Sequence, residues 1–278
     1  VAEMASFDLL HDYSMKLPIE LIGDMLGVPQ EDRPKLSPWA VAILSGLEAD
    51  LTPEQRDAAA RSVDDFKDYL RWLISERERN PLSDDTGEVL SKLVGPDEDG
   101  ESLTELELLH NCIFLLNAGH ETTANTVTNG IDALLRFPDQ LERLRADPDL
   151  IVPAIEELLR FESSVQLNNR KLTADAEIGG VAMRKDDYIW LCIGAANRDP
   201  DQFPDPDTLD IGRERNRHLA FGSGIHACAG MSLGRTEARI ALLGFVQRFA
   251  EIETSGMALR HPRARFRGFI DYPVTVTA

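Results

Sequence analysis

Cys228 lies in a short stretch, FGSGIHACAG at positions 221–230, that is crowded with glycine and carries one histidine. Glycine at positions 222, 224 and 230 permits positive φ angles and lets the backbone approach a bulky group closely. We expect a helix to begin near Gly230, so that Cys228 lies beside free backbone N–H groups at the positive end of the helix dipole. That environment stabilises an anion and lowers the pKa of a thiol. The loop therefore predicts a bound cysteine thiolate.

Two other chemistries are conceivable for a cysteine beside a histidine. His226 could serve as the base for a nucleophilic cysteine, as in a cysteine hydrolase. A zinc site would need more ligands than His226 and Cys228 supply. Cys112 and Cys192 lie among apolar residues and are expected to be small buried core residues. Three scattered cysteines do not make a disulfide framework, and the loop by itself leaves the partner of the thiolate open.

A second group of small and polar residues, AGHETT at positions 118–123, lies in the middle of a long apolar segment. Thr104 and Glu107 have the spacing of a capping box, and no proline follows until Pro138, so we expect one helix from Thr104 to Phe137. Glycine inside a helix costs about 1 kcal/mol relative to alanine, and a buried carboxylate must be paired or neutralised. A kink with back-bonding threonines would explain these residues. We favour a functional notch that faces a cavity.

Glu157 and Arg160 stand three residues apart on a predicted helix over residues 151–162, close enough to form an ion pair. Their apolar neighbours Ile155 and Leu158 indicate partial burial. If the pair is buried, loss of one partner would cost about 3–5 kcal/mol. We therefore interpret the two residues as a structural pair.

The elements that must position these residues are mainly α-helical, with weaker signals for small β-sheets. We expect helices over residues 7–26 (broken by Pro18), 53–78, 89–93 and 231–249, strands within 170–193, an irregular segment over 197–210, and a short hairpin of the C-terminal stretches FRGFI and YPVTVTA. Neither an internal repeat nor a linker divides the chain. Residues 1–278 are therefore predicted to form a single domain.

The formal net charge of −19 argues against a nucleic-acid partner, because phosphate binding needs a basic surface. The sequence contains no run of about eighteen apolar residues that could span a membrane, and the first residues lack the layout of a signal peptide, so we predict a cytoplasmic protein.

One segment is locally basic; its arginines are Arg213, Arg215, Arg217, Arg235 and Arg239. They form either a docking patch for an acidic partner or a chance cluster on solvated faces.

Four segments, in order, resemble the cytochrome P-450 monooxygenases. Phe221-x-x-Gly224-x-His226-x-Cys228-x-Gly230 resembles the haem-binding loop of that family. The other three are AGHETT, which resembles the oxygen-activating stretch of the family's central helix; ELLR at 157–160, which resembles its structural Glu-x-x-Arg pair; and NRDP at 197–200 with FPDP at 203–206, which resemble its irregular segment before the cysteine. The resemblance covers essentially the whole chain and implies the cytochrome P-450 fold.

The resemblance implies that the cofactor is haem b, iron protoporphyrin IX, with Cys228 as the thiolate ligand of the iron. His226 and Arg170 would pair with the haem propionates. His218 would either do the same or cap backbone groups of the loop. The implied cofactor-binding residues are Cys228, His226, Arg170, Phe221, Gly222, Gly230 and His218.

The implied reaction inserts one oxygen atom from O2 into a small hydrophobic substrate. Gly119, beside Ala118, would open space for dioxygen, while Glu121 and Thr122 would relay protons. Leu115, Val165, Leu167 and Asn168 are the expected substrate-pocket residues. Electrons would come from a ferredoxin and its reductase, and the arginine cluster would face that acidic partner.

The chain departs from the family pattern in two places. The resemblance begins in a middle helix, so the family's N-terminal helices and sheet are expected to be absent. Thr208-Leu209 stands where relatives often carry Arg-Phe, which leaves Arg198 or Arg213 as the third member of the Glu-x-x-Arg network. Two other functions therefore stay open. One is a peroxygenase-type or nitric-oxide-handling haem-thiolate protein, against which the acid–alcohol relay argues; the other is a truncated, non-catalytic haem-binding remnant or interaction module.

Overall fold

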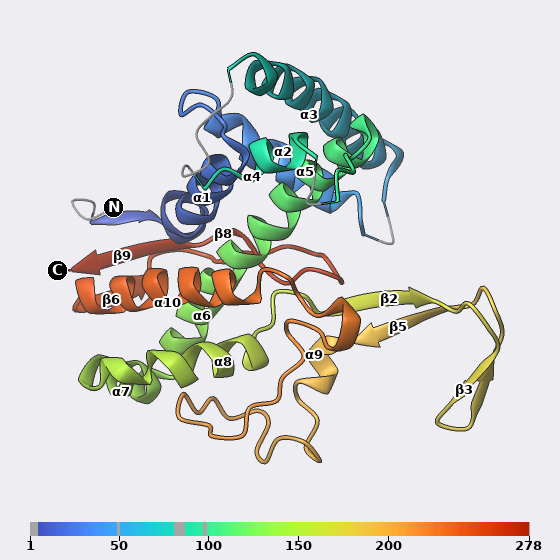
Figure 1. The fold of residues 1–278 in the computed structure, drawn as a ribbon. Coiled ribbons are helices and arrows are strands. Elements are labelled where there is room, and N and C mark those ends of the chain that lie inside the picture. The colour runs from blue at the N-terminus through green and yellow to red at the C-terminus, as the bar shows by residue number, and fades with distance from the viewer. Residues whose placement is uncertain (1–4, 49–50, 81–86, 97–98, 278) are drawn as a thin grey trace. The chain divides into compact units, whose positions relative to one another are not determined.

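The computed structural model describes residues 5–48, 51–80, 87–96 and 99–277, and Figure 1 shows its ribbon. The chain divides into two compact units. We call Leu10–Ala124 the helical unit, and Val1–Leu9 with Asn125–Ala278 the mixed unit. The predicted class, mainly α with small β-sheets, is confirmed. That residues 1–278 form a single domain stays a prediction.

The helical unit is built around one buried apolar cluster. Phe66, Leu70 and Leu73, on one side of a long helix, belong to the same cluster as Leu26 and Leu116. The helices of this unit are α1 (Lys16–Leu26), α2 (Leu36–Ser45), α3 (Pro53–Arg79), α4 (Val89–Val94) and α5 (Glu105–Gly119), with a π-helix at Leu9–Ser14 and a 3-10 turn at Arg33–Lys35.

The ends of these helices follow local sequence signals. At the start of α3 the hydroxyl of Thr52 accepts the N–H of Gln55 at 3.2 Å, and the Gln55 side chain accepts the N–H of Thr52 at 2.9 Å. Gly27 ends α1 in the left-handed conformation, with φ 64°. The predicted start of the first helix is wrong, because Ser6–Asp8 forms strand β1 and pairs with a distant strand.

The predicted single helix over residues 104–137 is interrupted at its polar centre. It begins as expected, since the Thr104 hydroxyl accepts the N–H of Glu107 at 3.3 Å and the Glu107 carboxylate accepts the N–H of Thr104 at 2.9 Å. However, α5 ends at Gly119, and α6 (Glu121–Arg136) begins after His120. Thr122 donates its hydroxyl to the carbonyl of Ala118 at 2.7 Å, so the kink with a back-bonding threonine, which was the less favoured interpretation, is present.

In the mixed unit, α6 packs against two helices from later in the chain. A Cβ on Gly130 would lie 2.8 Å from Leu242 Cδ1 and 3.3 Å from Leu158 Cδ1, so the lack of a side chain there allows close packing. Besides α6, the helices are α7 (Pro138–Ala146), α8 (Ile151–Phe161), α9 (Ile193–Ala196) and α10 (Met231–Arg248), with 3-10 turns at Pro148–Leu150 and Gly224–His226.

The strands of the mixed unit form small antiparallel sheets. The largest has the order β1–β9–β6, with β9 at Pro273–Thr277 and β6 at Glu251–Thr254. The two-stranded sheets are β2 (Leu167–Lys171) with β5 (Tyr188–Cys192), β3 (Ala176–Ile178) with β4 (Val181–Met183), and β7 (Leu259–Arg260) with β8 (Phe269–Asp271). The predicted C-terminal hairpin is wrong: β9 buries Val274 and Val276 between strands distant in sequence, while β8 pairs with β7.

The β2–β5 ladder runs away from α8 and α9 and carries the β3–β4 hairpin at its far end (Figure 1). Two strands bury little surface by themselves. Large apolar side chains are accordingly exposed along this arm; they are Tyr188, Trp190, Leu191, Ile178 and Val181. We call these two paired-strand segments the β arm.

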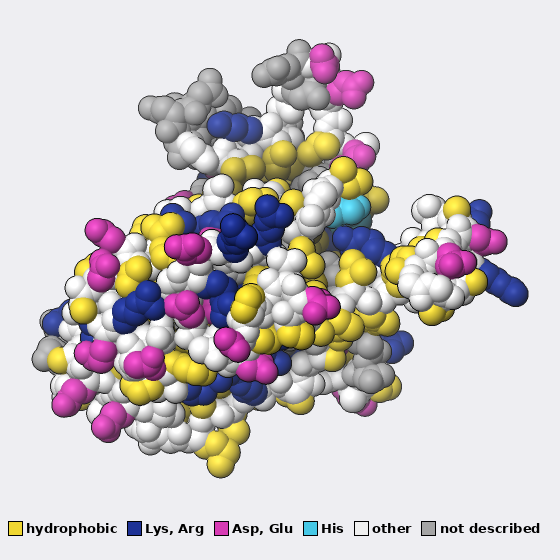
Figure 2. All heavy atoms as spheres, turned by 90° about the horizontal axis from the view of Figure 1, so that it is seen from below, with side chains coloured by type: hydrophobic (Ala, Val, Ile, Leu, Met, Phe, Trp, Pro, Cys, Tyr) yellow, Lys and Arg dark blue, Asp and Glu magenta, His cyan; other side chains and the backbone are white. Residues whose placement is uncertain are grey.

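Charges are mixed on the surface drawn in Figure 2, where Lys and Arg side chains alternate with Asp and Glu. Among the residues described, every helix is too short or too polar to cross a lipid bilayer.

Candidate functional site

Cys228 lies exposed in the loop that leads into α10. Its N–H donates to the carbonyl of Phe221 at 2.8 Å, and its carbonyl accepts the N–H of Met231, the first residue of α10, at 3.4 Å. These bonds hold the cysteine at the N-terminal end of α10, as the sequence indicated. Free N–H groups and the dipole at that end favour a thiolate.

The glycines of the loop have separate roles. Gly222 and Gly224 have φ angles of 69° and 70°, which an L side chain rarely adopts. Gly230 instead caps α10 with φ −87°, so the freedom of glycine to adopt a positive φ is not used there. A Cβ on Gly230 would lie 4.0 Å from the sulfur of Cys228, so its absence leaves room beside the sulfur.

His218 is bonded within the chain through both ring nitrogens. Its Nδ1 accepts the N–H of Ala220 at 3.2 Å, so the ring proton is on Nε2, which donates to Glu156 at 3.1 Å. This geometry favours the backbone-capping interpretation of His218 over a propionate contact. Burial raises the pKa of Glu156, but hydrogen bonds from His218 and Arg235 outweigh that effect and hold the pKa at about 2.

The predicted pair of Glu157 and Arg160 forms and is fully buried, with both side chains 0% exposed. Arg160 donates Nε and Nη2 to the two carboxylate oxygens at 2.8 and 2.7 Å. Its guanidinium also donates to the carbonyls of Asn197, Pro206 and Thr208 at 3.0, 2.8 and 3.3 Å. Since each polar group has partners, the pair ties α8 to the irregular segment before the cysteine loop.

Arg213 is the third member of this network. It donates Nε to both oxygens of Glu157, at 3.2 and 3.1 Å, and Nη1 to the carbonyl of Pro204 at 2.8 Å. Arg198, the other candidate, instead donates to the carbonyl of Phe161 at 2.7 Å and stacks on its ring, 3.7 Å from the centroid.

In the helical unit, the break between α5 and α6 places the predicted proton-relay residues within one turn. Glu121 is 3% exposed and Thr122 is half-buried, while Ala118 is exposed. Phe114, one turn before Ala118, is 66% exposed. Sequence reasoning missed Phe114, although helical spacing from Ala118 would have indicated it. These residues form an open helix side beside the break.

His120, at the break itself, is completely buried, and neither of its ring nitrogens has a hydrogen-bond partner among the described residues. Burial lowers its pKa to about 4, so the imidazole is neutral at physiological pH.

Gly119 lies against α1. A Cβ on Gly119 would be 2.5 Å from Cδ1 of Ile22, so the missing side chain permits close packing of α5 on α1. Opening space for dioxygen therefore stays a prediction for this residue, beside the packing role that the structure shows.

Three of the four predicted pocket residues lie together in the mixed unit. Val165 forms a bridge with Phe266, Leu167 begins β2, and the side-chain oxygen of Asn168 accepts Nη2 of Arg265 at 3.0 Å. Leu115 lies in the helical unit and packs against its apolar cluster.

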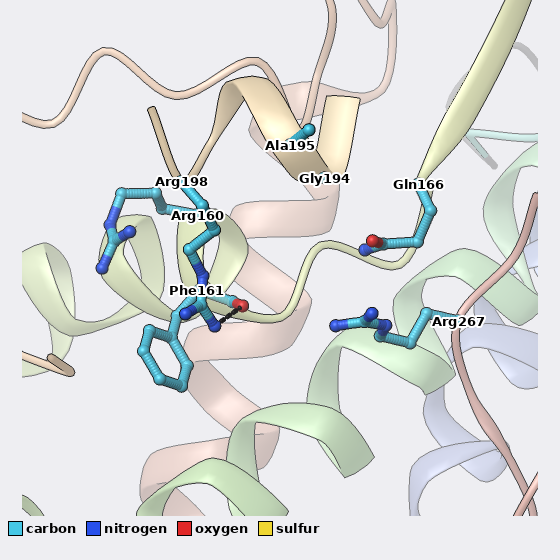
Figure 3. Close-up of a pocket in the computed structure, with 7 residues that line it drawn as sticks. All are labelled: Arg160, Phe161, Gln166, Gly194, Ala195, Arg198 and Arg267. Atoms are coloured by element: carbon cyan, nitrogen blue, oxygen red, sulfur yellow. Dashed lines mark hydrogen bonds between the residues drawn. The ribbon is translucent and has the colours of Figure 1, made fainter. Parts of the chain in front are cut away.

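Two cavities of about 350 and 540 Å³ adjoin this segment. Both are lined by Gln166, Gly194, Ala195 and Arg267. In the smaller cavity, the side chains of Gln166 and Arg267 point toward Arg160 and Phe161 (Figure 3). Of the residues that line the cavities, the sequence analysis had named Arg160, Arg198, Leu167 and Cys192. It missed the four shared lining residues, because residues from distant segments converge here.

Cys112 is buried as expected, and burial raises the pKa of its thiol to about 12. The expectation for Cys192 is wrong, since its side chain is exposed and lines the larger cavity. Cys192 ends β5, and a two-stranded ladder is too narrow to cover it.

The arginine cluster does not act as one surface. Arg213 and Arg235 bind the carboxylates of α8, and Arg239 is half-buried. Arg215 and Arg217 are exposed. A docking patch must therefore depend on the last two.

The geometry also weighs against the two other cysteine chemistries. The described residues contain no hydrogen bond between His226 and Cys228, which a nucleophile and its base need. They also contain no cluster of three or more His, Cys, Asp or Glu side chains that could hold a metal ion.

A cysteine fixed ahead of a helix, with a buried Glu–Arg pair behind it in a mainly helical fold, agrees with the comparisons. The profile of the Cytochrome P450 family matches residues 49–263, and the chain belongs to this family. It is 38% identical over 272 residues to "Biotin biosynthesis cytochrome P450" and 40% identical over 250 residues to "Cytochrome P450", both from Bacillus subtilis. These alignments cover 96% and 90% of this chain.

Solved structures agree. The crystal structure of P450BioI in complex with acyl carrier protein ligated to hexadec-9Z-enoic acid matches with a TM-score of 0.93 at 36% identity, covering 100% of this chain and 70% of that one. The cytochrome P450 PksS of Bacillus subtilis matches with a TM-score of 0.90 at 34% identity, covering 99% and 70%. The chain spans 67% and 59% of the length of the two curated relatives named above.

The cofactor of this family is haem b held by a cysteine thiolate. The residues present fit that group. The thiol of Cys228 is exposed at a helix N-terminus, the side-chain position of Gly230 beside its sulfur is empty, and His226 is exposed in the same loop.

Proposed function

We propose that this chain supplies the thiolate ligand and the proton-handling residues of a haem-thiolate monooxygenase. The observation that carries the proposal is the exposed Cys228, fixed by backbone bonds to Phe221 and Met231 at the start of α10. Haem, when bound, supplies activation of dioxygen. Residues of the chain would hold the haem, ligate its iron and handle the protons.

On the cysteine side, Cys228 would ligate the iron, and its negative charge would increase the electron density there. His226 and Arg170 would bind the propionates. His226 is exposed, and Arg170 is half-buried on β2, where its Nη1 donates to the carbonyl of Asn169 at 2.8 Å. The remaining donors of that guanidinium suit a carboxylate.

On the oxygen side, the Thr122 hydroxyl would donate a proton towards dioxygen. Glu121 would then supply a new proton to that hydroxyl. The Thr122 hydroxyl donates to Ala118 at rest, so it must turn away from that carbonyl to donate elsewhere. Glu121 is buried and directly precedes Thr122 at the start of α6, so it could pass a proton to that hydroxyl without involving bulk water.

The substrate would be a small hydrophobic organic molecule, taken with O2, and a ferredoxin with its reductase would supply electrons. The hydrophobic character of the substrate is supported by the mostly apolar residues at the predicted pocket positions. Relatives carry names as different as "Biotin biosynthesis cytochrome P450", "Polyketide biosynthesis cytochrome P450 PksS" and "Vitamin D(3) 25-hydroxylase", which supports a small organic molecule without narrowing it further. The exposed Arg215 and Arg217 would meet the acidic donor, and the setting would be the cytoplasm.

The test is a carbon-monoxide difference spectrum of the reduced, haem-loaded chain. We expect the far-red-shifted Soret band of a thiolate-ligated haem, its loss in Cys228→Ser, and its retention in Cys192→Ser, the matched variant of another exposed cysteine. Retention of the band in Cys228→Ser would overturn the proposal.

A non-catalytic haem-binding function is the alternative that the same experiment distinguishes. It predicts the same spectrum without product formation from O2 and reductant. Product formed only with added peroxide would instead identify a peroxygenase.

A further inference from the structure

One carboxylate holds both ends of the cysteine loop. Glu156, on α8, accepts Nε2 of His218, which precedes the loop, at 3.1 Å. It also accepts Nε and Nη2 of Arg235, which follows the loop on α10, at 2.7 and 2.9 Å. The adjacent Glu157 faces a different set of arginines, so Glu156 is a separate anchor.

Arg235 is connected to the cysteine through Phe221. Its guanidinium lies over the Phe221 ring, 4.7 Å from the centroid, and the carbonyl of Phe221 accepts the N–H of Cys228. The side chain of Arg235 is 27% exposed, and that of Glu156 is 23% exposed, so water screens the pair only in part. The hydrogen bond to Glu156 raises the pKa of Arg235 and burial opposes that effect; the charges of Glu156 and of a negative Cys228 add smaller increases. The guanidinium is therefore within electrostatic reach of the sulfur.

We propose that Glu156 and Arg235 are positioning residues that set the electrostatic field at Cys228: Arg235 stabilises negative charge on the sulfur, and Glu156 offsets that stabilisation. The inference rests on the proposed function, because its effect is measured at a haem bound to Cys228. A cation near the ligand favours the reduced haem, which holds one more electron, and an anion favours the oxidised haem.

This assignment predicts shifts of opposite sign from the two halves of one ion pair. Arg235→Gln removes the positive charge and should lower the reduction potential of the haem-loaded chain. Glu156→Gln leaves Arg235 without its counter-charge and should raise the potential. Arg235→Lys keeps the charge but loses the two-point hydrogen bond, and should stay near the wild-type potential. His218→Gln keeps a side-chain donor for Glu156 and leaves the ion pair of Glu156 and Arg235 in place, so it should also leave the potential nearly unchanged.

The experiment is a spectroelectrochemical titration of the wild type and the four variants, with the carbon-monoxide spectrum of each recorded first. Opposite shifts for Arg235→Gln and Glu156→Gln support the field. Shifts in the same direction, or none, in variants that keep the thiolate band would overturn it and reduce the pair to a structural clamp. If the wild type lacks the thiolate band, the proposed function itself fails and this inference fails with it. A further outcome is that Arg235→Gln and Glu156→Gln lose the thiolate band while the wild type and Arg235→Lys keep it. That result would show that the ion pair only holds the loop in place, and it would contradict the proposed electrostatic effect on Cys228.

Discussion

Arg213 donates Nε to both carboxylate oxygens of Glu157, so a residue between the irregular segment and the cysteine loop completes an ion pair that lies within α8. Glu157 also accepts the side chain of Asn216 and the N–H of Asp210, both at 3.0 Å. The carboxylate is thus the point where α8 holds the chain that leads to Cys228.

Loss of Arg213 should therefore destabilise the fold. Arg213→Ala removes charged hydrogen bonds from a buried carboxylate, and we expect a loss of about 2–3 kcal/mol in the free energy of unfolding. Glu157→Gln should cost more, about 3–5 kcal/mol, because it leaves buried Arg160 unpaired. Urea unfolding followed by circular dichroism measures both. Arg143→Ala, which breaks an exposed pair with Asp210, is the control and should cost less than about 1 kcal/mol. Equal losses in all three variants would contradict the special role of Glu157.

Glu237 should make stability depend on pH. Its side chain is buried on α10, one carboxylate oxygen has no hydrogen-bond partner, and burial raises its pKa to about 7. Because the pKa is higher in the folded state than in the unfolded chain, folding favours the protonated acid. That stability is fully present below about pH 4.5 and is lost as the pH rises through about 7.

Glu237→Gln should remove this dependence. The free energy of unfolding of the variant minus that of the wild type should be about 3 kcal/mol larger at pH 8 than at pH 4.5. This magnitude follows because one pKa unit corresponds to about 1.4 kcal/mol. Unfolding titrations at several pH values measure the difference. A constant gap between the two proteins across this range would show that Glu237 ionises normally.

The contact between Gly119 and Ile22 should be visible in a double-mutant cycle. Gly119→Ala introduces a methyl group 2.5 Å from Cδ1 of Ile22, and the strain should cost about 1–3 kcal/mol despite the better helix propensity of alanine. Adding Ile22→Ala should recover part of that loss. Additive costs of the two substitutions would show that α1 and α5 are not in tight contact there.

Thr122→Ala should reduce the product formed per electron consumed in an active preparation, because the relay loses its hydroxyl. Thr122→Ser should retain coupling. Thr126, one turn further along α6, shares a hydrogen bond with Ser164 at 2.8 Å and provides the matched control, Thr126→Ala. Product and peroxide are measured together against reductant consumed. Unchanged coupling in Thr122→Ala would show that this hydroxyl takes no part in the proton relay.

Reversal of charge at Arg215 and Arg217 should slow reduction by an acidic ferredoxin without weakening substrate binding. Both side chains are exposed, and long-range attraction governs such encounters. Stopped-flow reduction at low and moderate salt measures the rate. The matched control reverses Arg184 and Lys185, which are both exposed in the turn between β4 and β5. An equal effect of both double variants would show that only net charge matters.

Local chemistry was readable from the sequence, and long-range pairing was not. The capping box at Thr104, the Glu157–Arg160 pair and the glycine loop around Cys228 depend on residues a few positions apart, so their spacing predicted them. The partnership of Glu156 with Arg235 joins residues 79 positions apart, and no local pattern marks it.

The same distinction explains the errors. Phe7 and Asp8 were predicted to be helical because β9, the strand partner of β1, lies at the other end of the chain. The burial of Cys192 was inferred from apolar neighbours in sequence, whereas exposure depends on how many strands flank β5.

The β arm has a consequence for handling the protein. Tyr188, Trp190 and Leu191 lie on a ladder of only two strands, and unpaired strand edges are templates for pairing with other chains. In a concentrated solution the arms of separate molecules can add to one another edge to edge. Colloidal stability, rather than folding stability, should then set the concentration at which the purified chain precipitates, and substitution of Trp190 by lysine should raise that limit.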